Sequence, residues 1–188
     1  ADRWVGAGYL GARDPLGAAS MERIDPRFPE LSGYALSQTD VNVEEVAALD
    51  PQVVLTSSRS EWLDVIQTLG IDVVAFEGES PELLKDSMLI TGAMLGPNAL
   101  ARAEAWVEYF DTVFADVVAV TSELDADELV RVLFTGTDAL RVASGQMYQT
   151  AMIEAAGGIS VSDSLRGFWN DVNLEQVLLW QPDVIFVP

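Results

Sequence analysis

The apolar and polar positions of the chain divide it into two stretches of different character. Residues 1–41 are rich in glycine and proline, which predicts mostly loop with a few helical turns. From Asn42 onwards, short apolar runs typical of buried parallel strands alternate with segments of helical period. The predicted strands cover 53–56, 71–76, 129–135, 139–144 and 183–187, and the predicted short helices cover 43–49, 60–69, 80–96 and 148–156. This alternation predicts an α/β protein with parallel sheets.

The longest helical signal lies over residues 98–119. Apolar residues recur there at intervals of three or four, at Leu100, Ala103, Val107, Phe110, Phe114 and Val117. Such spacing places them on one face of a helix. At about 1.5 Å per residue the helix spans roughly 33 Å, which is the width of a small domain. By itself, this pattern favours a core helix of one domain over a linker between two domains.

One supersecondary pattern occurs twice. Residues 41–57 read VNVEEVAALDPQVVLTS and residues 172–188 read VNLEQVLLWQPDVIFVP, identical at six of 17 positions. Each copy begins with an asparagine helix cap that has Glu or Gln three residues later. A short helix, a proline and an apolar strand follow. Because the copies flank the long helical segment, they indicate two similar lobes joined by that helix, and the linker interpretation becomes the preferred one.

The repeated block resembles the class of ABC-importer substrate-binding proteins that carry ferric siderophores, haem, cobalamin and some oxyanions. The resemblance extends over nearly the whole chain. It implies two Rossmann-like α/β lobes with parallel sheets, bridged by a single long α-helix, with the ligand between the lobes. Residues 1–96 would form the N-terminal lobe, 97–120 the linker helix and 121–188 the start of the C-terminal lobe. Family members have further elements before Ala1 and after Pro188, so the resemblance also implies a chain truncated at both ends.

The resemblance assigns Glu44 and Glu175 to permease docking. In such proteins one glutamate on each lobe inserts between arginines of the membrane permease, and both positions match here. Arg–carboxylate pairs give strong, directional contacts. The structural alternative is that each glutamate occupies the second helical position, where an acidic side chain complements the helix dipole. That alternative explains two acidic residues but not the repetition of the whole block.

Ligand-binding residues are expected in loops at the carboxyl ends of the strands, where open α/β sheets bind their ligands. The candidates are Tyr34, Gln38, Ser58 and Arg59 in the first lobe and Arg141, Tyr148, Arg166 and Trp169 in the second. Trp169 falls where many members of the resembling family place an aromatic residue facing the ligand. The arginines would supply the local positive charge that an anionic ligand needs in an acidic protein. Packing of the tryptophan under a loop and pairing of the arginines with carboxylates are the structural alternatives.

The composition excludes several other classes of protein. The chain has no cysteine and no histidine, which removes cysteine nucleophiles, zinc fingers, iron–sulfur clusters and Ser-His-Asp triads. Its 30 acidic and 10 basic residues give a net charge of −20. Such a surface repels phosphate backbones and anionic lipids, which disfavours nucleic-acid binding and polybasic membrane docking. The acidity favours an acidic or salt-adapted proteome, and the absence of cysteine is consistent with export.

A glycine motif lies near the start of the chain. Residues 6–11 match the G-x-G-x-x-G pattern of dinucleotide-binding proteins. That fingerprint needs a helix that opens on the last glycine. Because Pro15 and Gly17 follow closely, we expect no helix there and therefore no nucleotide binding.

The sequence thus predicts a substrate-binding component of an ABC importer, without catalysis, cofactor or resident metal. We expect it to be exported, either in the periplasm or as a cell-surface lipoprotein, and to have an ABC permease as its partner. A ferric siderophore or related iron complex is the leading candidate for the cargo. Cobalamin, haem and an oxyanion such as molybdate are the open alternatives. Weaker candidates for residues that ligate haem or iron are Tyr9, Tyr34 and Tyr148. The alternatives of another class are a carboxylate-dependent α/β enzyme using Asp138, Asp163 or Asp171, and a ligand-free partner-binding module.

Overall fold

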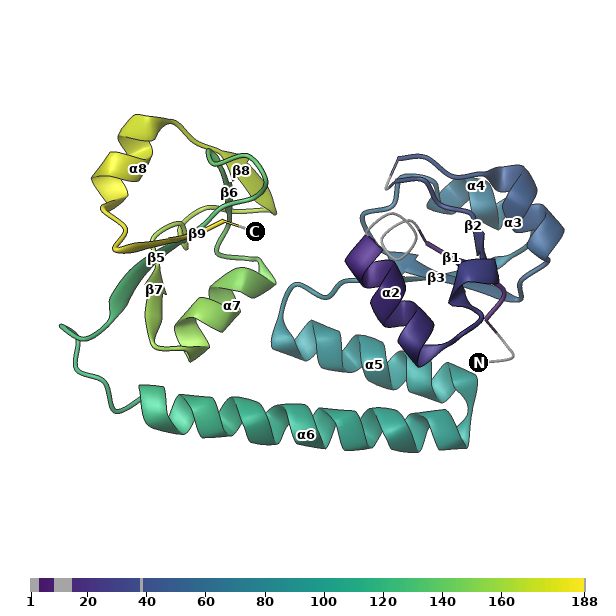
Figure 1. The fold of residues 1–188 in the computed structure, drawn as a ribbon, viewed down its shortest axis with the longest axis horizontal. Coiled ribbons are helices and arrows are strands. Elements are labelled where there is room, and N and C mark those ends of the chain that lie inside the picture. The colour runs from purple at the N-terminus through teal and green to yellow at the C-terminus, as the bar shows by residue number, and fades with distance from the viewer. Residues whose placement is uncertain (1–3, 9–14, 38, 188) are drawn as a thin grey trace. The chain divides into compact units, whose positions relative to one another are not determined.

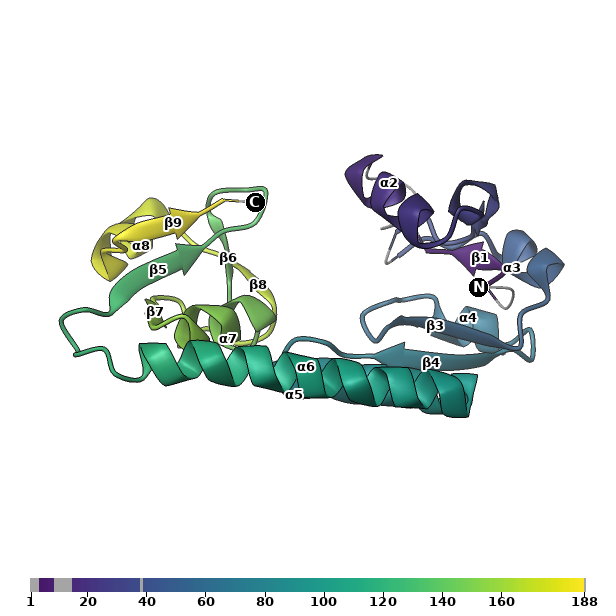
Figure 2. The same cartoon turned by 60° about the horizontal axis from the view of Figure 1, so that its bottom comes forward.

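The computed structural model describes residues 4–8, 15–37 and 39–187 (Figures 1 and 2). The chain divides into two compact units, Ala1–Glu77 and Gly78–Pro188, and each is described by itself. Within the described part of the chain, no helix is both long and apolar enough to cross a membrane.

The first unit contains two pairs of parallel strands with short helices around them. Its elements are β1 (Gly6–Ala7), α2 (Pro15–Ile24), the 3-10 helix η1 (Phe28–Glu30), β2 (Ser32–Gly33), α3 (Val43–Leu49), β3 (Val53–Ser57), α4 (Leu63–Gln67) and β4 (Asp72–Phe76). β1 pairs with β2, and β3 pairs with β4. The core lies where α3 and α4 pack on β3, and it is formed by Ala35, Val46, Val54, Trp62 and Ile66. Because α3 and α4 pack on β3, the loop that follows β3 starts from a well-packed strand.

The second unit combines a helix pair with an α/β sheet. Its elements are α5 (Pro81–Leu95), α6 (Pro97–Thr121), β5 (Val130–Phe134), β6 (Arg141–Ala143), α7 (Tyr148–Ala155), β7 (Gly158–Ser160), β8 (Trp169–Asp171), α8 (Leu174–Trp180) and β9 (Val184–Phe186). A parallel sheet has the order β7-β5-β9, and β6 pairs antiparallel with β8. α7 packs against β5 and β7 (Figure 1). The core cluster is formed by Leu133, Val142 and Val161.

Helices α5 and α6 lie side by side (Figure 2). Gly92 permits this close approach, because a Cβ atom at this position would lie 2.8 Å from the Cβ of Ala103. Lys85 on α5 forms an ion pair with Asp111 on α6, with 2.7 Å between Nζ and Oδ1. The predicted long helix over 98–119 is therefore present as α6, and it contacts α5 from Ala99 to Asp111.

The structure confirms the α/β class with parallel sheets and a long helix. It also confirms that the two copies of the repeat have the same local structure. The side chain of Asn42 accepts a hydrogen bond from the N–H of Glu45 (3.1 Å), and that of Asn173 accepts one from Gln176 (2.8 Å). Each capped helix, α3 or α8, then leads through a proline into a parallel strand.

Three expectations about secondary structure were wrong. Residues 15–24 form the helix α2 in a stretch interpreted as mostly loop, because proline is well suited to the first position of a helix. Pro15 and Gly17 therefore do not prevent a helix after the glycine motif, contrary to expectation. Residues 9–14, which include part of the motif, lie outside the described part of the chain. The helix predicted over 60–69 is reduced to α4, since Ser57–Ser60 form a turn first.

Both copies of the repeat also share a feature that the sequence did not reveal. Asp50 and Gln181 end α3 and α8 in the left-handed region, at φ 46° and 47°. In this region the Cβ atom of a residue other than glycine crowds the backbone, at a cost of about 1–2 kcal/mol, with Asp and Asn tolerated best. The Gln181 position should therefore hold more strain than the Asp50 position.

We expect Gln181→Gly to stabilise the protein by about 1 kcal/mol, and Asp50→Gly to stabilise it by less. Urea unfolding followed by circular dichroism measures both changes. Gln181→Ala is the matched control, because it keeps the Cβ atom and should give no gain. A gain from alanine equal to that from glycine would show that the strain is not in the backbone.

Candidate functional site

The loop after β3 is one of two places where predicted ligand-binding residues gather. The Ser58 N–H donates to the carbonyl of Phe76 (2.8 Å), and the Arg59 N–H donates to Oγ of Ser57 (3.2 Å). The hydroxyls of Thr56 and Ser60 are 3.0 Å apart, which closes the turn. Ser58 is exposed and Arg59 is half-buried. Both therefore lie on a fixed turn at the carboxyl ends of β3 and β4.

Tyr34 has a packing role in the first unit. Its ring meets Trp62 edge-on, with 6.2 Å between centroids, beside the core of this unit. Burial raises the pKa of the Tyr34 hydroxyl, so the phenol is neutral at ordinary pH. Gln38 and Tyr9, which were also candidates, lie outside the described residues.

The second gathering place is the carboxyl end of β5. Thr135 follows the strand and is buried, and its hydroxyl lies 3.1 Å from the carbonyl oxygen of Gly136 and 3.2 Å from that of Phe186. The N–H of Gly136 donates to the carbonyl of Arg141 (2.6 Å). These bonds join the end of the parallel sheet to β6.

The β6–β8 ladder places Arg141 and Trp169 on one face. Arg141 lies opposite Asp171, and Ala143 lies opposite Trp169. Directly opposed residues and residues two apart share a face of a sheet, whereas the buried Val142 lies between them on the other face. Arg141 is exposed and Trp169 is half-buried. An aromatic ring, a cation and a carboxylate are therefore neighbours at this end of the sheet.

The turn before β8 is held by side chains. The guanidinium of Arg166 donates to the carbonyls of Asp163 (3.1 Å) and Leu165 (3.2 Å), although the residue is exposed. Asn170 donates from Nδ2 to the carbonyl of Arg166 (3.1 Å), and Oε1 of Gln146 accepts from the N–H of Gly167 (2.7 Å). Arg166 thus stabilises the turn that leads into β8.

The remaining candidates have different surroundings. Tyr148 is half-buried at the start of α7, where its N–H faces the carboxylate of Glu79 at 3.5 Å. Asp138 accepts a hydrogen bond from the Leu140 N–H (3.0 Å), which is a turn-stabilising role. Within the described residues, no group of three or more acidic side chains is arranged to hold a metal ion.

Glu44 and Glu175 are both exposed, each at the second position of its helix. Their positions in α3 and α8 correspond within the repeat. Neither side chain is needed for the local cap, because the asparagine side chains supply it. Both carboxylates are therefore accessible to a partner.

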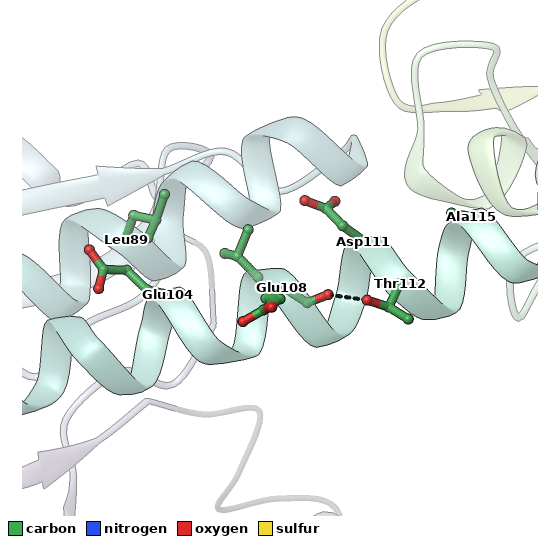
Figure 3. A pocket seen from close by; sticks show the side chains of 7 residues that line it. Leu89, Glu104, Glu108, Asp111, Thr112 and Ala115 are labelled. Carbon is green, nitrogen blue, oxygen red and sulfur yellow. Dashed lines mark hydrogen bonds between the residues drawn. The ribbon is translucent and has the colours of Figure 1, made fainter.

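Figure 3 shows a hollow between α5 and α6 that sequence reasoning missed. Its volume is about 680 Å³, and it is lined by Leu89, Glu104, Val107, Glu108, Asp111, Thr112 and Ala115. The Thr112 hydroxyl donates to the carbonyl of Glu108 (2.8 Å), and the hydrogen bond with Asp111 raises the pKa of Lys85. The spacing of Glu104, Glu108 and Asp111 by about one helical turn was the available signal.

Comparison with known proteins identifies the family. The sequence profile of the periplasmic binding protein family matches residues 34–188, and the chain belongs to this family. The molybdate-binding protein MolA of Haemophilus influenzae is 30% identical over 182 residues, covering 85% of this chain and 51% of MolA. The chain thus spans about half the length of this curated relative.

Solved structures show the same fold. MolA bound to molybdate has a TM-score of 0.75 at 22% identity, covering 90% of this chain and 57% of that one. The haem-binding protein RhuT from Roseiflexus has a TM-score of 0.71 at 23% identity, covering 90% and 65%. The vitamin B12-binding protein BtuF of Vibrio cholerae has a TM-score of 0.71 at 16% identity, covering 95% and 71%. This agrees with the resemblance found in the sequence.

Proposed function

We propose that this protein is the substrate-binding component of an ABC importer and that it binds an anionic metal species. The observation that carries the proposal is that, in each unit taken by itself, arginines lie near the carboxyl ends of parallel strands, with Trp169 on the β6–β8 ladder of the second unit, in a chain of the periplasmic binding protein family. The carboxyl ends of the strands are where open α/β sheets bind ligands. In this role the protein captures its cargo outside the cytoplasm and delivers it to a permease.

The charge distribution favours an anion as cargo. The chain has only ten basic residues, and three of them lie in these two regions: Arg59, Arg141 and Arg166. In a protein of net charge −20, an anion needs such local cations to approach. A ferric siderophore of the catecholate type and an oxyanion such as molybdate share this chemistry. Molybdate also has the support of the 30% identical relative.

Binding is tested by titrating the purified protein with sodium molybdate, a ferric catecholate siderophore, haemin and cyanocobalamin, using tryptophan quenching and calorimetry. We expect molybdate or the siderophore to bind. Arg141→Gln and Arg166→Gln should each weaken that binding about tenfold or more, because charge-assisted hydrogen bonds contribute about 1.5–3 kcal/mol. Arg102→Gln is the control, since this exposed arginine lies on α6 and changes the net charge equally.

The outcomes separate the parts of the proposal. Binding of cyanocobalamin alone would retain the binding-protein role and overturn the anionic cargo. Equal losses from Arg102→Gln and Arg141→Gln would show a general charge effect instead of a local site. Failure of the folded protein to bind any of the four would contradict the role itself and favour the enzyme or the ligand-free module.

A further inference from the structure

We propose that Gly145 is a positioning residue that fixes the Arg166 guanidinium for an anionic cargo. The proposal rests on the proposed function, in which Arg166 supplies positive charge to the anion. Gly145 lies in the loop between β6 and α7, and Arg166 lies in the turn before β8. The loop and the turn are in direct contact, because a Cβ atom built on Gly145 would overlap the carbonyl oxygen of Asp163 and lie 2.6 Å from its Oδ1.

The carbonyl groups that hold Arg166 are the same groups that Gly145 contacts. Nη1 of Arg166 donates to the carbonyl of Asp163 at 3.1 Å and to that of Leu165 at 3.2 Å. The N–H of Gly145 donates to the same Leu165 carbonyl at 3.3 Å. A change at residue 145 therefore reaches the guanidinium through both of its hydrogen-bond acceptors.

The neighbours of Gly145 in the chain hold the same turn. Oε1 of Gln146 accepts from the N–H of Gly167 (2.7 Å), and Oγ of Ser144 donates to the Gly167 carbonyl (2.5 Å). Ser144 is fully buried, and its own carbonyl accepts from the buried hydroxyl of Thr150 (2.9 Å). The turn cannot retreat from a side chain at residue 145 without breaking these bonds, so such a side chain must distort the turn.

Arg166 keeps hydrogen-bond donors for a ligand. It is exposed, and among the described residues only its Nη1 group has protein acceptors. The N–H groups of Nε and Nη2 form a fork that suits two oxygens of an anion. Because Nη1 is tied to the turn, this fork has a fixed direction, and less freedom is lost when a ligand binds.

A matched pair of glycine substitutions tests the proposal. Gly145→Ala places a methyl group where Asp163 already lies, whereas Gly136→Ala places one at ordinary contact distance, 3.4 Å or more from its neighbours. The Nε–H resonance of Arg166 in ¹⁵N-labelled protein, assigned by its loss in Arg166→Gln, reports on the guanidinium directly. We expect Gly145→Ala to shift this resonance and Gly136→Ala to leave it unchanged. Circular dichroism checks that each variant is folded.

Binding of the cargo provides the second measurement. In Gly145→Ala the Kd for sodium molybdate or the ferric catecholate siderophore should rise about tenfold, as expected when one charge-assisted hydrogen bond is lost. In an Arg166→Gln background, Gly145→Ala should have no further effect on the Kd, which is the signature of coupling between the two residues. Gln146→Ala removes the bond to Gly167 without a steric clash. It should also shift the Arg166 resonance, and it should raise the Kd about threefold.

An unchanged Arg166 resonance or an unchanged Kd in folded Gly145→Ala would overturn the positioning role. If Gly145→Ala does not fold, the same results in Gln146→Ala would overturn it. An equal rise of the Kd with and without the Arg166 guanidinium would do so as well, because the change would then act through the fold. If the wild-type protein binds neither probe, the proposed function fails, and the Arg166 resonance still decides whether Gly145 positions the guanidinium.

Discussion

Reversing both repeated glutamates, in the double variant Glu44→Arg and Glu175→Arg, is expected to reduce docking to the permease about a thousandfold while cargo binding is unchanged. Both carboxylates are exposed at matching positions of α3 and α8. Loss of one partner from a hydrogen-bonded charge pair costs about 2 kcal/mol or more, so two sites give roughly 4 kcal/mol. The measurement is the stimulation of ATP hydrolysis by the permease complex in liposomes as a function of binding-protein concentration.

A matched variant carries the same change of charge elsewhere. Asp64→Arg with Glu154→Arg reverses one exposed helical acid in each unit and should leave docking within about threefold of wild type. Each single variant, Glu44→Arg or Glu175→Arg, should weaken docking about thirtyfold. Normal docking by the double variant would contradict the docking role of these residues. Loss of cargo binding as well would indicate that they support the fold.

The repeat was the most informative part of the sequence. Its signals were local: an asparagine that caps a helix, a proline that ends it and an apolar strand. Local hydrogen bonds determine such features, and both asparagine caps form as the sequence predicts. The long helix α6 was predictable because its apolar residues recur every three or four positions, which is the helical repeat.

The features that sequence reasoning missed depend on contacts between distant residues. Trp169 could be selected as an aromatic residue before the second repeat, but its strand partner, Ala143, lies 26 positions earlier in the chain. The short strand β8 exists because it pairs with β6, and its three residues carry no apolar run of their own. Tyr34 was chosen for its polar group, whereas its ring packs against Trp62. No single-sequence pattern encodes these pairings.

The second large effect is on stability: raising NaCl from about 0.1 M to about 2 M should raise the Tm by about 10 °C or more. A net charge of −20 destabilises the compact state by self-repulsion. Salt shortens the screening length from about 10 Å at 0.1 M to about 3 Å at 1 M. Glu104, Glu108 and Asp111 show the repulsion locally, because like charges one turn apart on a helix destabilise it. Differential scanning calorimetry across a salt series measures the change.

Charge variants separate screening from the general strengthening of apolar burial by salt. Glu104→Gln with Glu108→Gln removes two of the three carboxylates that line the α5–α6 hollow (Figure 3). This variant should raise the Tm at 0.1 M by about 1–4 °C and reduce its salt dependence, because it relieves two like-charge pairs worth about 0.4–1 kcal/mol together, and 1 kcal/mol shifts the Tm by about 2–4 °C at this size. Glu104→Asp with Glu108→Asp keeps the charge and should show neither change. As salt is added, most of the screening of surface charges is complete by about 0.5 M. The stabilisation that salt gives to apolar burial continues to increase at higher concentrations. A Tm that climbs only above 1 M, equally in all three proteins, would therefore assign the stabilisation to the hydrophobic core instead of the acidic surface.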